Sequence, residues 1–199
     1  MNYQKVEFAK SAATAAQFPR DGLPQIAFAG KSNVGKSSVI NRVLQRKKLA
    51  YVGASPGKTI HVNYFLVDHT AYLVDLPGYG YAKVSKSEKE RWSRLMESYF
   101  AASELITLGI MIVDARHAPT QNDVTMATWF QESGCPFVVV ANKLDKLKKS
   151  EIEGNMQRIR EVLSLSDDTD LIPFSAEKGT GRSELVGVIE AAVKRSQTT

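Results

Sequence analysis

Hydrophobic residues follow two alternating patterns along the chain. Six short runs have the composition of strands: 26–29, 62–67, 71–75, 110–113, 137–141 and 171–174. The second and third runs are close enough together to form an antiparallel hairpin. Most of the intervening segments carry apolar residues three and four positions apart, as in helices with one buried face. The pattern predicts a three-layer α/β fold: a mostly parallel six-stranded sheet with one antiparallel strand pair and helices on both faces.

Composition indicates one globular domain, because the chain has 199 residues, of which 43% are hydrophobic and 24% charged. We expect residues 1–24 to form a lead-in that packs on the sheet edge, and residues 25–199 to form the domain itself. The sequence has no apolar run long enough to span a membrane and no signal-peptide pattern, which predicts a cytoplasmic protein. Cys135 is the single cysteine, so an internal disulfide is excluded.

A phosphate-binding loop is predicted after the first apolar run. Residues 30–37 read G-x-x-x-x-G-K-S and precede a helical pattern, as in P-loop proteins. Gly30 and Gly35 let successive backbone N–H groups turn toward phosphates at the positive end of a helix. Lys36 would then reach the outer phosphates, and the Ser37 hydroxyl would bind the magnesium ion that neutralises them.

A carboxylate is predicted beside this loop. The third strand-like run ends in Asp75-Leu76-Pro77-Gly78, and Asp75 would accept a magnesium-bound water there. A D-x-x-G sequence is common by chance, so its weight comes from its position after the phosphate loop and a hairpin.

The fifth strand-like run leads into a predicted base-recognition sequence. Asn142-Lys143-Leu144-Asp145 reads N-K-x-D, in which Asp145 can accept both N–H donors on the Watson–Crick edge of guanine. Asn142 can face N7 of the base and brace the neighbouring loop. Ser175-Ala176 follows the last strand-like run, where a small residue lets a backbone N–H approach the guanine carbonyl. Adenine lacks the donor pair, so this sequence predicts guanine selectivity.

Positive charge gathers in the first third of the chain. The net charge is +5, and residues 22–67 contain no Asp or Glu. Arg42, Arg46, Lys47 and Lys48, at the end of the first predicted helix, have no obvious internal partner. They favour a polyanion such as RNA, or they form a solvated helix end, where basic residues are common. Both interpretations remain open at this stage.

Five motifs in order resemble the guanine-nucleotide motifs of small GTPases: 30–37, Thr59, 75–78, 142–145 and 175–176. Longer phrases are more specific: 31–38 (KSNVGKSS), 56–59 (PGKT), 76–80 (LPGYG) and 116–119 (RHAP). They resemble the EngB/YsxC group of bacterial GTPases, within the TrmE–Era–EngA–EngB branch, over nearly the whole chain. Many members of that group have Thr where this chain has Asn142.

The resemblance implies a GTP-dependent switch that binds GTP or GDP with Mg²⁺ and hydrolyses GTP slowly. Many small GTPases place a glutamine directly after the D-x-x-G glycine, whereas this chain has Tyr79. The resemblance also implies a role in assembling the large ribosomal subunit through ribosomal RNA, and in normal cell division and septation. We expect a monomer that does not bind membranes.

The resemblance assigns roles to residues by motif. The catalytic residues are Lys36, Thr59, Gly78 and Asn33, and Asn33 also matches a position that holds a potassium ion in relatives. The magnesium ligands are Ser37, Thr59 and Asp75. The nucleotide-binding residues are Gly30, Lys31, Ser32, Asn33, Val34, Gly35, Lys36, Ser37, Ser38, Gly57, Lys58, Thr59, Asp75, Leu76, Pro77, Gly78, Asn142, Lys143, Leu144, Asp145, Phe174, Ser175 and Ala176.

Two other functions remain open from the residues alone. A metabolic P-loop kinase would also carry the phosphate loop, but it would need an acceptor-binding lid, which the sequence does not indicate. A binding module stabilised by nucleotide, without useful turnover, is compatible with the missing glutamine. Segments 51–60 and 79–86 are expected to be mobile loops, and His61 and His117 to be loop or packing residues.

Overall fold

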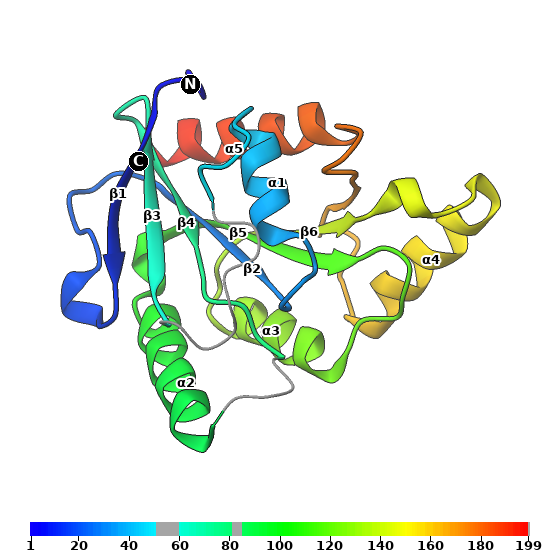
Figure 1. Ribbon diagram of the computed structural model, residues 1–199, viewed down its shortest axis with the longest axis horizontal. Helices are drawn as coiled ribbons and strands as arrows, with labels where there is room; N and C mark the ends of the chain where they lie inside the picture. Colours follow the sequence, from blue (N-terminus) through cyan, green and yellow to red (C-terminus); the bar gives the residue numbers. More distant parts are fainter. Residues whose placement is uncertain (51–59, 81–84, 199) are drawn as a thin grey trace.

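The computed structural model describes residues 1–50, 60–80 and 85–198. Its strands are β1 (Val6–Ala12), β2 (Gln25–Gly30), β3 (Val62–Val67), β4 (Ala71–Asp75), β5 (Ile106–Asp114), β6 (Phe137–Asn142) and β7 (Leu171–Pro173). They form one sheet in the order β1-β3-β4-β2-β5-β6-β7 (Figure 1). The five strands from β4 to β7 in this order are parallel, and β3 lies antiparallel to both β4 and β1.

The predicted fold class is confirmed, with seven strands where the sequence pattern predicted six. The additional strand is β1, which pairs with the outer edge of β3 and adds a second antiparallel pairing to the predicted hairpin. Five of its seven residues are exposed, so backbone hydrogen bonds rather than burial hold it in place. A strand of this kind carries little hydrophobic periodicity, which explains why the pattern did not count it.

Helices cover both faces of the sheet (Figure 1). The α-helices are α1 (Lys36–Val43), α2 (Lys86–Ala101), α3 (Gln121–Glu132), α4 (Lys149–Val162) and α5 (Arg182–Ser196), with 3-10 turns η1 (Ala15–Gln17), η2 (Ser103–Leu105) and η3 (Leu144–Lys146). Buried side chains of α1 and α5 belong to the core on one face, and those of α2, α3 and α4 to the core on the other. Within the described ranges, no helix is both long and apolar enough to cross a bilayer.

Strand β2 is the point at which the chain changes direction across the sheet. The chain leaves β2 through α1 toward β4 on one side, then returns through α2 on the opposite face to β5 on the other side. In open α/β sheets, such a reversal opens a crevice outside the carboxyl ends of the strands. The segments that follow β2, β4, β5, β6 and β7 therefore meet at one edge of the sheet.

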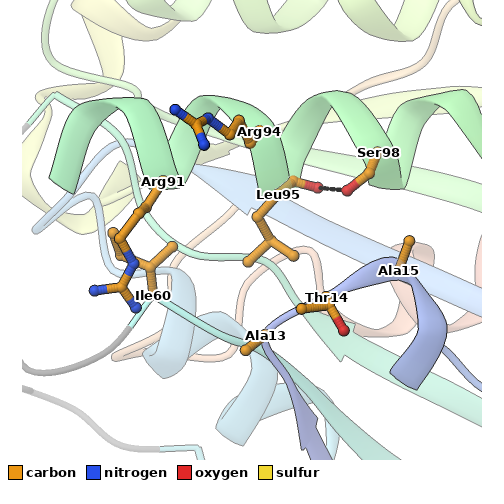
Figure 2. Close-up of a pocket in the computed structure, with 8 residues that line it drawn as sticks. All are labelled: Ala13, Thr14, Ala15, Ile60, Arg91, Arg94, Leu95 and Ser98. Atoms are coloured by element: carbon orange, nitrogen blue, oxygen red, sulfur yellow. Dashed lines mark hydrogen bonds between the residues drawn. The ribbon is translucent and has the colours of Figure 1, made fainter. Parts of the chain in front are cut away.

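A separate cavity of about 330 Å³ lies between α2 and the segment joining β1 to η1 (Figure 2). Leu95 and Ile60 line it together with the small residues of 13–15, and Arg91 and Arg94 contribute their side chains from α2. Among the described residues, none of those predicted to contact nucleotide lines this cavity.

Candidate functional site

The loop between β2 and α1 has the backbone geometry of an anion-binding loop. Gly35 is the N-cap residue of α1 and has φ +95°, in the left-handed region that favours glycine. A Cβ at this position would lie 2.5 Å from Nδ2 of Asn142. Within the described part of the chain, no side chain caps the N-terminus of α1, and no acidic residue lies in its first turn. The first N–H groups of α1 are therefore free of side-chain caps at the end of the helix that attracts anions.

Lys36 and Asp75 meet at this loop. The Lys36 ammonium, on the first residue of α1, forms an ion pair with the Asp75 carboxylate at the end of β4. Both side chains are largely buried, at 11% and 12% exposure. Ser37 is the next residue of α1, followed by Ser38. The structure thus brings together the lysine and the carboxylate that the sequence assigned to phosphate and magnesium, and Ser37 follows the lysine in α1.

The D-x-x-G segment lies directly against the phosphate loop. The N–H of Leu76 donates to Phe28 O at 3.0 Å, and the N–H of Ser32 donates to Tyr79 O at 2.8 Å. A Cβ on Gly78 would lie 3.3 Å from Oγ of Ser32, so the two segments are in close contact. Pro77 O accepts a 3.2 Å hydrogen bond from the indole N–H of Trp92.

Asn142 joins the phosphate loop to the loop after β7. Its side chain is 2% exposed, donates to Val34 O at 3.1 Å, and accepts from the N–H of Ala176 at 3.1 Å. The bracing role predicted for this residue corresponds to these two contacts. Leu144 N–H donates to Phe174 O at 3.0 Å, which ties the N-K-x-D segment to the same loop.

Asp145 is held in an orientation suited to accepting hydrogen bonds. Its Oδ1 accepts from the Ser175 hydroxyl at 2.6 Å, and the Lys146 ammonium lies 3.2 Å from Oδ2. The Ser175 hydrogen bond, followed by that from Lys146, holds the pKa of Asp145 below its usual value. The carboxylate is therefore ionised at neutral pH, as recognition of two N–H donors requires.

Lys143 links the N-K-x-D segment to the phosphate loop through its own side chain. Its ammonium donates to Asn33 O at 3.1 Å and to Asp114 Oδ2 at 3.0 Å. Asp114 also accepts two hydrogen bonds from the Arg116 guanidinium, at 2.9 and 2.8 Å. Burial would raise the pKa of Asp114, but the hydrogen bonds from Arg116 and Lys143 outweigh it and lower that pKa.

The sequence analysis did not assign Asp114 to the site. The available signal was its position, since it is the last residue of β5 and β5 neighbours the strand that carries the phosphate loop. A carboxylate at the carboxyl end of a central parallel strand lies at the ligand-binding edge of such a sheet. Arg116, two residues further on, was noted only for its family resemblance.

Arg42 has internal partners, which corrects the expectation from the sequence. Its guanidinium donates to Ala176 O at 2.6 Å and to Glu177 O at 2.7 Å, on the loop that follows β7. Arg182, the first residue of α5, donates to Arg42 O at 2.9 Å and to Val43 O at 2.8 Å, at the end of α1. Arg42 therefore ties α1 to the predicted base pocket and is not a free basic side chain.

Arg46, like Arg42, has an internal hydrogen-bond partner, which corrects the expectation from the sequence for this residue as well. Arg46 donates to Gln4 O at 2.5 Å, while Lys47 and Lys48 are exposed.

Among the predicted nucleotide contacts, Gly57, Lys58 and Thr59 lie outside the described residues, as does all of the predicted mobile loop 51–60 except Ile60. In the second predicted mobile loop, 79–86, residues 81–84 lie outside the description, and Tyr79 is buried.

Comparison with known proteins identifies close relatives. A family model described as "50S ribosome-binding GTPase" matches residues 25–143. The chain is 43% identical to a probable GTP-binding protein EngB of Oceanobacillus iheyensis, over 98% of this chain and 100% of that protein. It is 44% identical to a protein of the same description from Clostridium acetobutylicum, over 100% of both chains.

Solved structures share the fold. A probable GTP-binding protein EngB superimposes with a TM-score of 0.70 at 24% identity, covering 86% of this chain and 99% of that one. Era in complex with MgGDPNP and nucleotides 1506–1542 of 16S ribosomal RNA superimposes with a TM-score of 0.62 at 24% identity, covering 84% of this chain and 55% of that one.

Proposed function

Because the chain belongs to the EngB family of GTP-binding proteins and is a GTPase, we propose that the crevice at the carboxyl ends of β2, β4, β6 and β7 is its guanine-nucleotide site. The observation that carries the proposal is the position of Asn142. It contacts Val34 in the phosphate loop and Ala176 in the predicted base pocket, so one buried side chain couples the two halves of the site. A nucleotide lying across Asn142 would place its phosphates at α1 and its base at Asp145.

In the described structure the Lys36 ammonium pairs with Asp75. In this proposal it binds the phosphates instead when the nucleotide is present. Asp75 and Ser37, with Thr59, would hold Mg²⁺, which would supply positive charge against the phosphates. The fit rests on the donor set, since a buried carboxylate and a helix N-terminal hydroxyl adjoin the loop. Gly78 would offer its backbone N–H to the γ-phosphate, so that hydrolysis releases the D-x-x-G segment and the predicted loop 51–60.

A direct test compares GTP, GDP and ATP for binding and for multiple-turnover hydrolysis. We expect tight binding of both guanine nucleotides, at least tenfold weaker binding of ATP, and slow release of phosphate from GTP. Equal affinity for ATP would favour the kinase alternative, and tight GTP binding without turnover would favour the binding module.

Slow hydrolysis is expected because Tyr79 replaces the water-orienting glutamine and its ring is buried away from the phosphate loop. By resemblance, Asn33 would hold a potassium ion, which would supply positive charge beside the phosphates. We predict faster hydrolysis in potassium than in sodium at equal ionic strength, measured as phosphate release. The Asn33→Ala variant should lose this difference, and equal wild-type rates in the two salts would contradict the mechanism.

We further propose that the protein is a cytoplasmic monomer that acts in assembly of the large ribosomal subunit, and thereby in normal cell division and septation. The family description and the RNA bound to Era, a related fold, support a ribosomal partner. Lys47 and Lys48 are exposed at the end of α1 and can approach RNA phosphates, whereas Arg42 is committed to internal contacts.

The ribosomal contact predicts a specific salt dependence. The double variant Lys47→Glu/Lys48→Glu should sediment less with large ribosomal subunits, and wild-type binding should fall steeply as salt rises, because phosphate contacts release counterions. Binding to the subunit should be tighter in the GTP state. Lys58 is next in sequence to Thr59, which is predicted to respond to the γ-phosphate and magnesium, so the position of Lys58 would depend on the nucleotide. Charge reversal of Lys149 and Arg158, two exposed residues of α4, is the matched control. Unchanged sedimentation of the Lys47/Lys48 variant would return these residues to the solvated-helix-end interpretation.

A further inference from the structure

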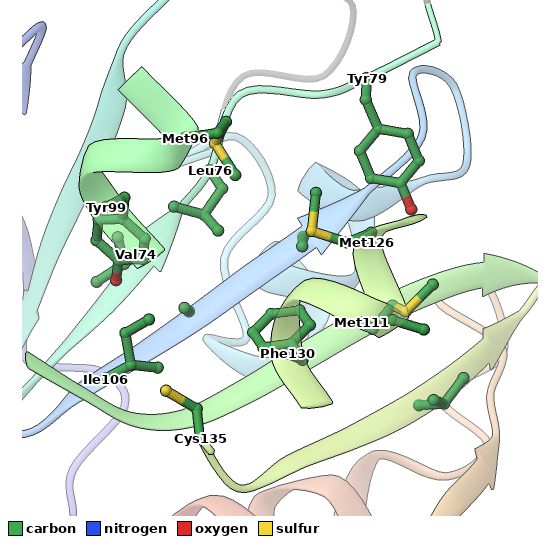
Figure 3. Close-up of a cluster of buried hydrophobic side chains, with 14 of the residues drawn as sticks. Val74, Leu76, Tyr79, Met96, Tyr99, Ile106, Met111, Met126, Phe130 and Cys135 are labelled. Atoms are coloured by element: carbon green, nitrogen blue, oxygen red, sulfur yellow. The ribbon is translucent and has the colours of Figure 1, made fainter. Parts of the chain in front are cut away.

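Tyr79 occupies the position after the D-x-x-G glycine, but its side chain points into the core. Its side chain lies on the α2–α3 side of the sheet, near Met126 of α3 (Figure 3), and the residue is only 5% exposed. Trp92 of α2 packs edge-on against the ring at 6.4 Å between centroids. The Tyr79 hydroxyl donates a 2.8 Å hydrogen bond to Oδ1 of Asp123.

Asp123 is itself buried, at 4% exposure, and both of its oxygens have donors. Its Oδ2 accepts from the N–H and the hydroxyl of Thr120, each at 2.7 Å, at the N-terminus of α3. Tyr79 supplies the donor to Oδ1. A buried carboxylate oxygen without a donor is costly, so the carboxylate holds the ring of Tyr79 in place.

The backbone of Tyr79 is fixed at the opposite end. Its carbonyl accepts from Ser32 twice, from the N–H at 2.8 Å and from the hydroxyl at 3.0 Å. The residue before Gly78 is also fixed, because Pro77 O accepts from Trp92. Gly78 therefore lies between two anchored residues, in close contact with the phosphate loop.

We propose that Tyr79 is a positioning residue, anchored between Ser32 and Asp123, that holds the N–H of Gly78 ready for the γ-phosphate. This inference rests on the proposed nucleotide site. A group held in place before the ligand arrives lowers the ordering cost of binding and of the reaction. GDP has no γ-phosphate, so the anchoring favours GTP selectively. The tyrosine thus contributes to the switch although its side chain faces away from the phosphates.

The Tyr79→Phe variant tests this proposal, because it removes only the hydroxyl that reaches Asp123. We expect affinity for a non-hydrolysable GTP analogue to fall by about two- to tenfold relative to affinity for GDP, the range that loss of one hydrogen bond produces. The rate constant for GTP hydrolysis should fall as well. Tyr99→Phe is the matched control: it removes a hydroxyl from the same buried cluster, and that hydroxyl has no partner within the described residues.

Tryptophan emission gives an independent readout. The chain has two tryptophans, Trp92 and Trp129, whose rings are stacked with 6.0 Å between centroids. The Trp129→Phe variant leaves only Trp92, whose indole N–H donates a hydrogen bond to Pro77 O. We expect the GTP analogue and GDP to give different Trp92 emission, and Tyr79→Phe to diminish that difference.

Two outcomes would overturn the proposal. One is unchanged affinity for both the analogue and GDP in Tyr79→Phe, and the other is an equal loss for both nucleotides, which would give Tyr79 a purely structural role. The variant Asp145→Asn, assayed in parallel, separates this failure from failure of the nucleotide site, because it tests the base pocket alone.

Discussion

Replacing Asp145 by Asn should weaken GTP and GDP binding by at least about tenfold and shift preference toward xanthine nucleotides. Asp145 is oriented by the Ser175 hydroxyl, and its lowered pKa keeps it ionised. Each charge-assisted bond to guanine contributes about 1.5–3 kcal/mol, and an asparagine presents a donor where guanine also has donors. Xanthine has a carbonyl in place of the exocyclic amine, which the new amide can meet.

The measurement is a titration of Asp145→Asn with GDP and with xanthosine diphosphate, by calorimetry or with fluorescent analogues. Asp168→Asn, an exposed residue in the segment before β7, is the matched control and should bind GDP like the wild type. Unchanged GDP affinity in Asp145→Asn would remove Asp145 from the base pocket and leave the guanine preference without an explanation.

Much of this candidate site could be predicted from the sequence, because each motif is a short segment that lies directly after a strand-like run. Three motifs each follow a strand-like run: the glycine-rich loop before Lys36, the N-K-x-D segment and Ser175-Ala176. Because the carboxyl ends of parallel strands lie at one edge of a sheet, the three motifs are expected to lie close together. Thus the bracing of a neighbouring loop by Asn142 could be anticipated from topology, and the structure shows contacts with two loops.

Features that depend on contacts between distant segments could not be predicted from local patterns. Arg42 resembles a solvated residue in sequence, but its partner Ala176 is 134 positions away. Tyr79 lies in a glycine-rich, polar stretch typical of a loop, yet it finds Asp123 across 44 positions and is buried. The edge strand β1 was not predicted from the hydrophobic pattern, because its side chains are mostly exposed. In each case the decisive information was the three-dimensional neighbour, not the composition around the residue.

Replacing Gly35 by Ala should weaken nucleotide binding strongly and lower the stability of the fold only modestly. The left-handed backbone at Gly35 disfavours any side chain by about 1–3 kcal/mol, and the added methyl group would meet Nδ2 of Asn142 at 2.5 Å. Either the phosphate loop or Asn142 must move, and both belong to the site. The loss of aligned N–H groups, together with displacement of Asn142 from Val34, predicts at least about a hundredfold weaker GDP binding, since two charge-assisted bonds alone contribute about that much.

The control for this prediction is Gly134→Ala, at the end of α3. Gly134 has φ +68°, so the substitution carries a similar backbone strain, but a Cβ there has no heavy atom within 4 Å. Thermal unfolding and GDP titration of both variants separate strain from collision. We expect both melting temperatures to fall by a few degrees, while only Gly35→Ala loses nucleotide, because strain lowers stability at either site but only the collision at residue 35 reaches Asn142. Near-normal GDP binding by Gly35→Ala would mean that the loop can relax around the methyl group, and that Asn142 does not fix the phosphate loop as the described contacts indicate.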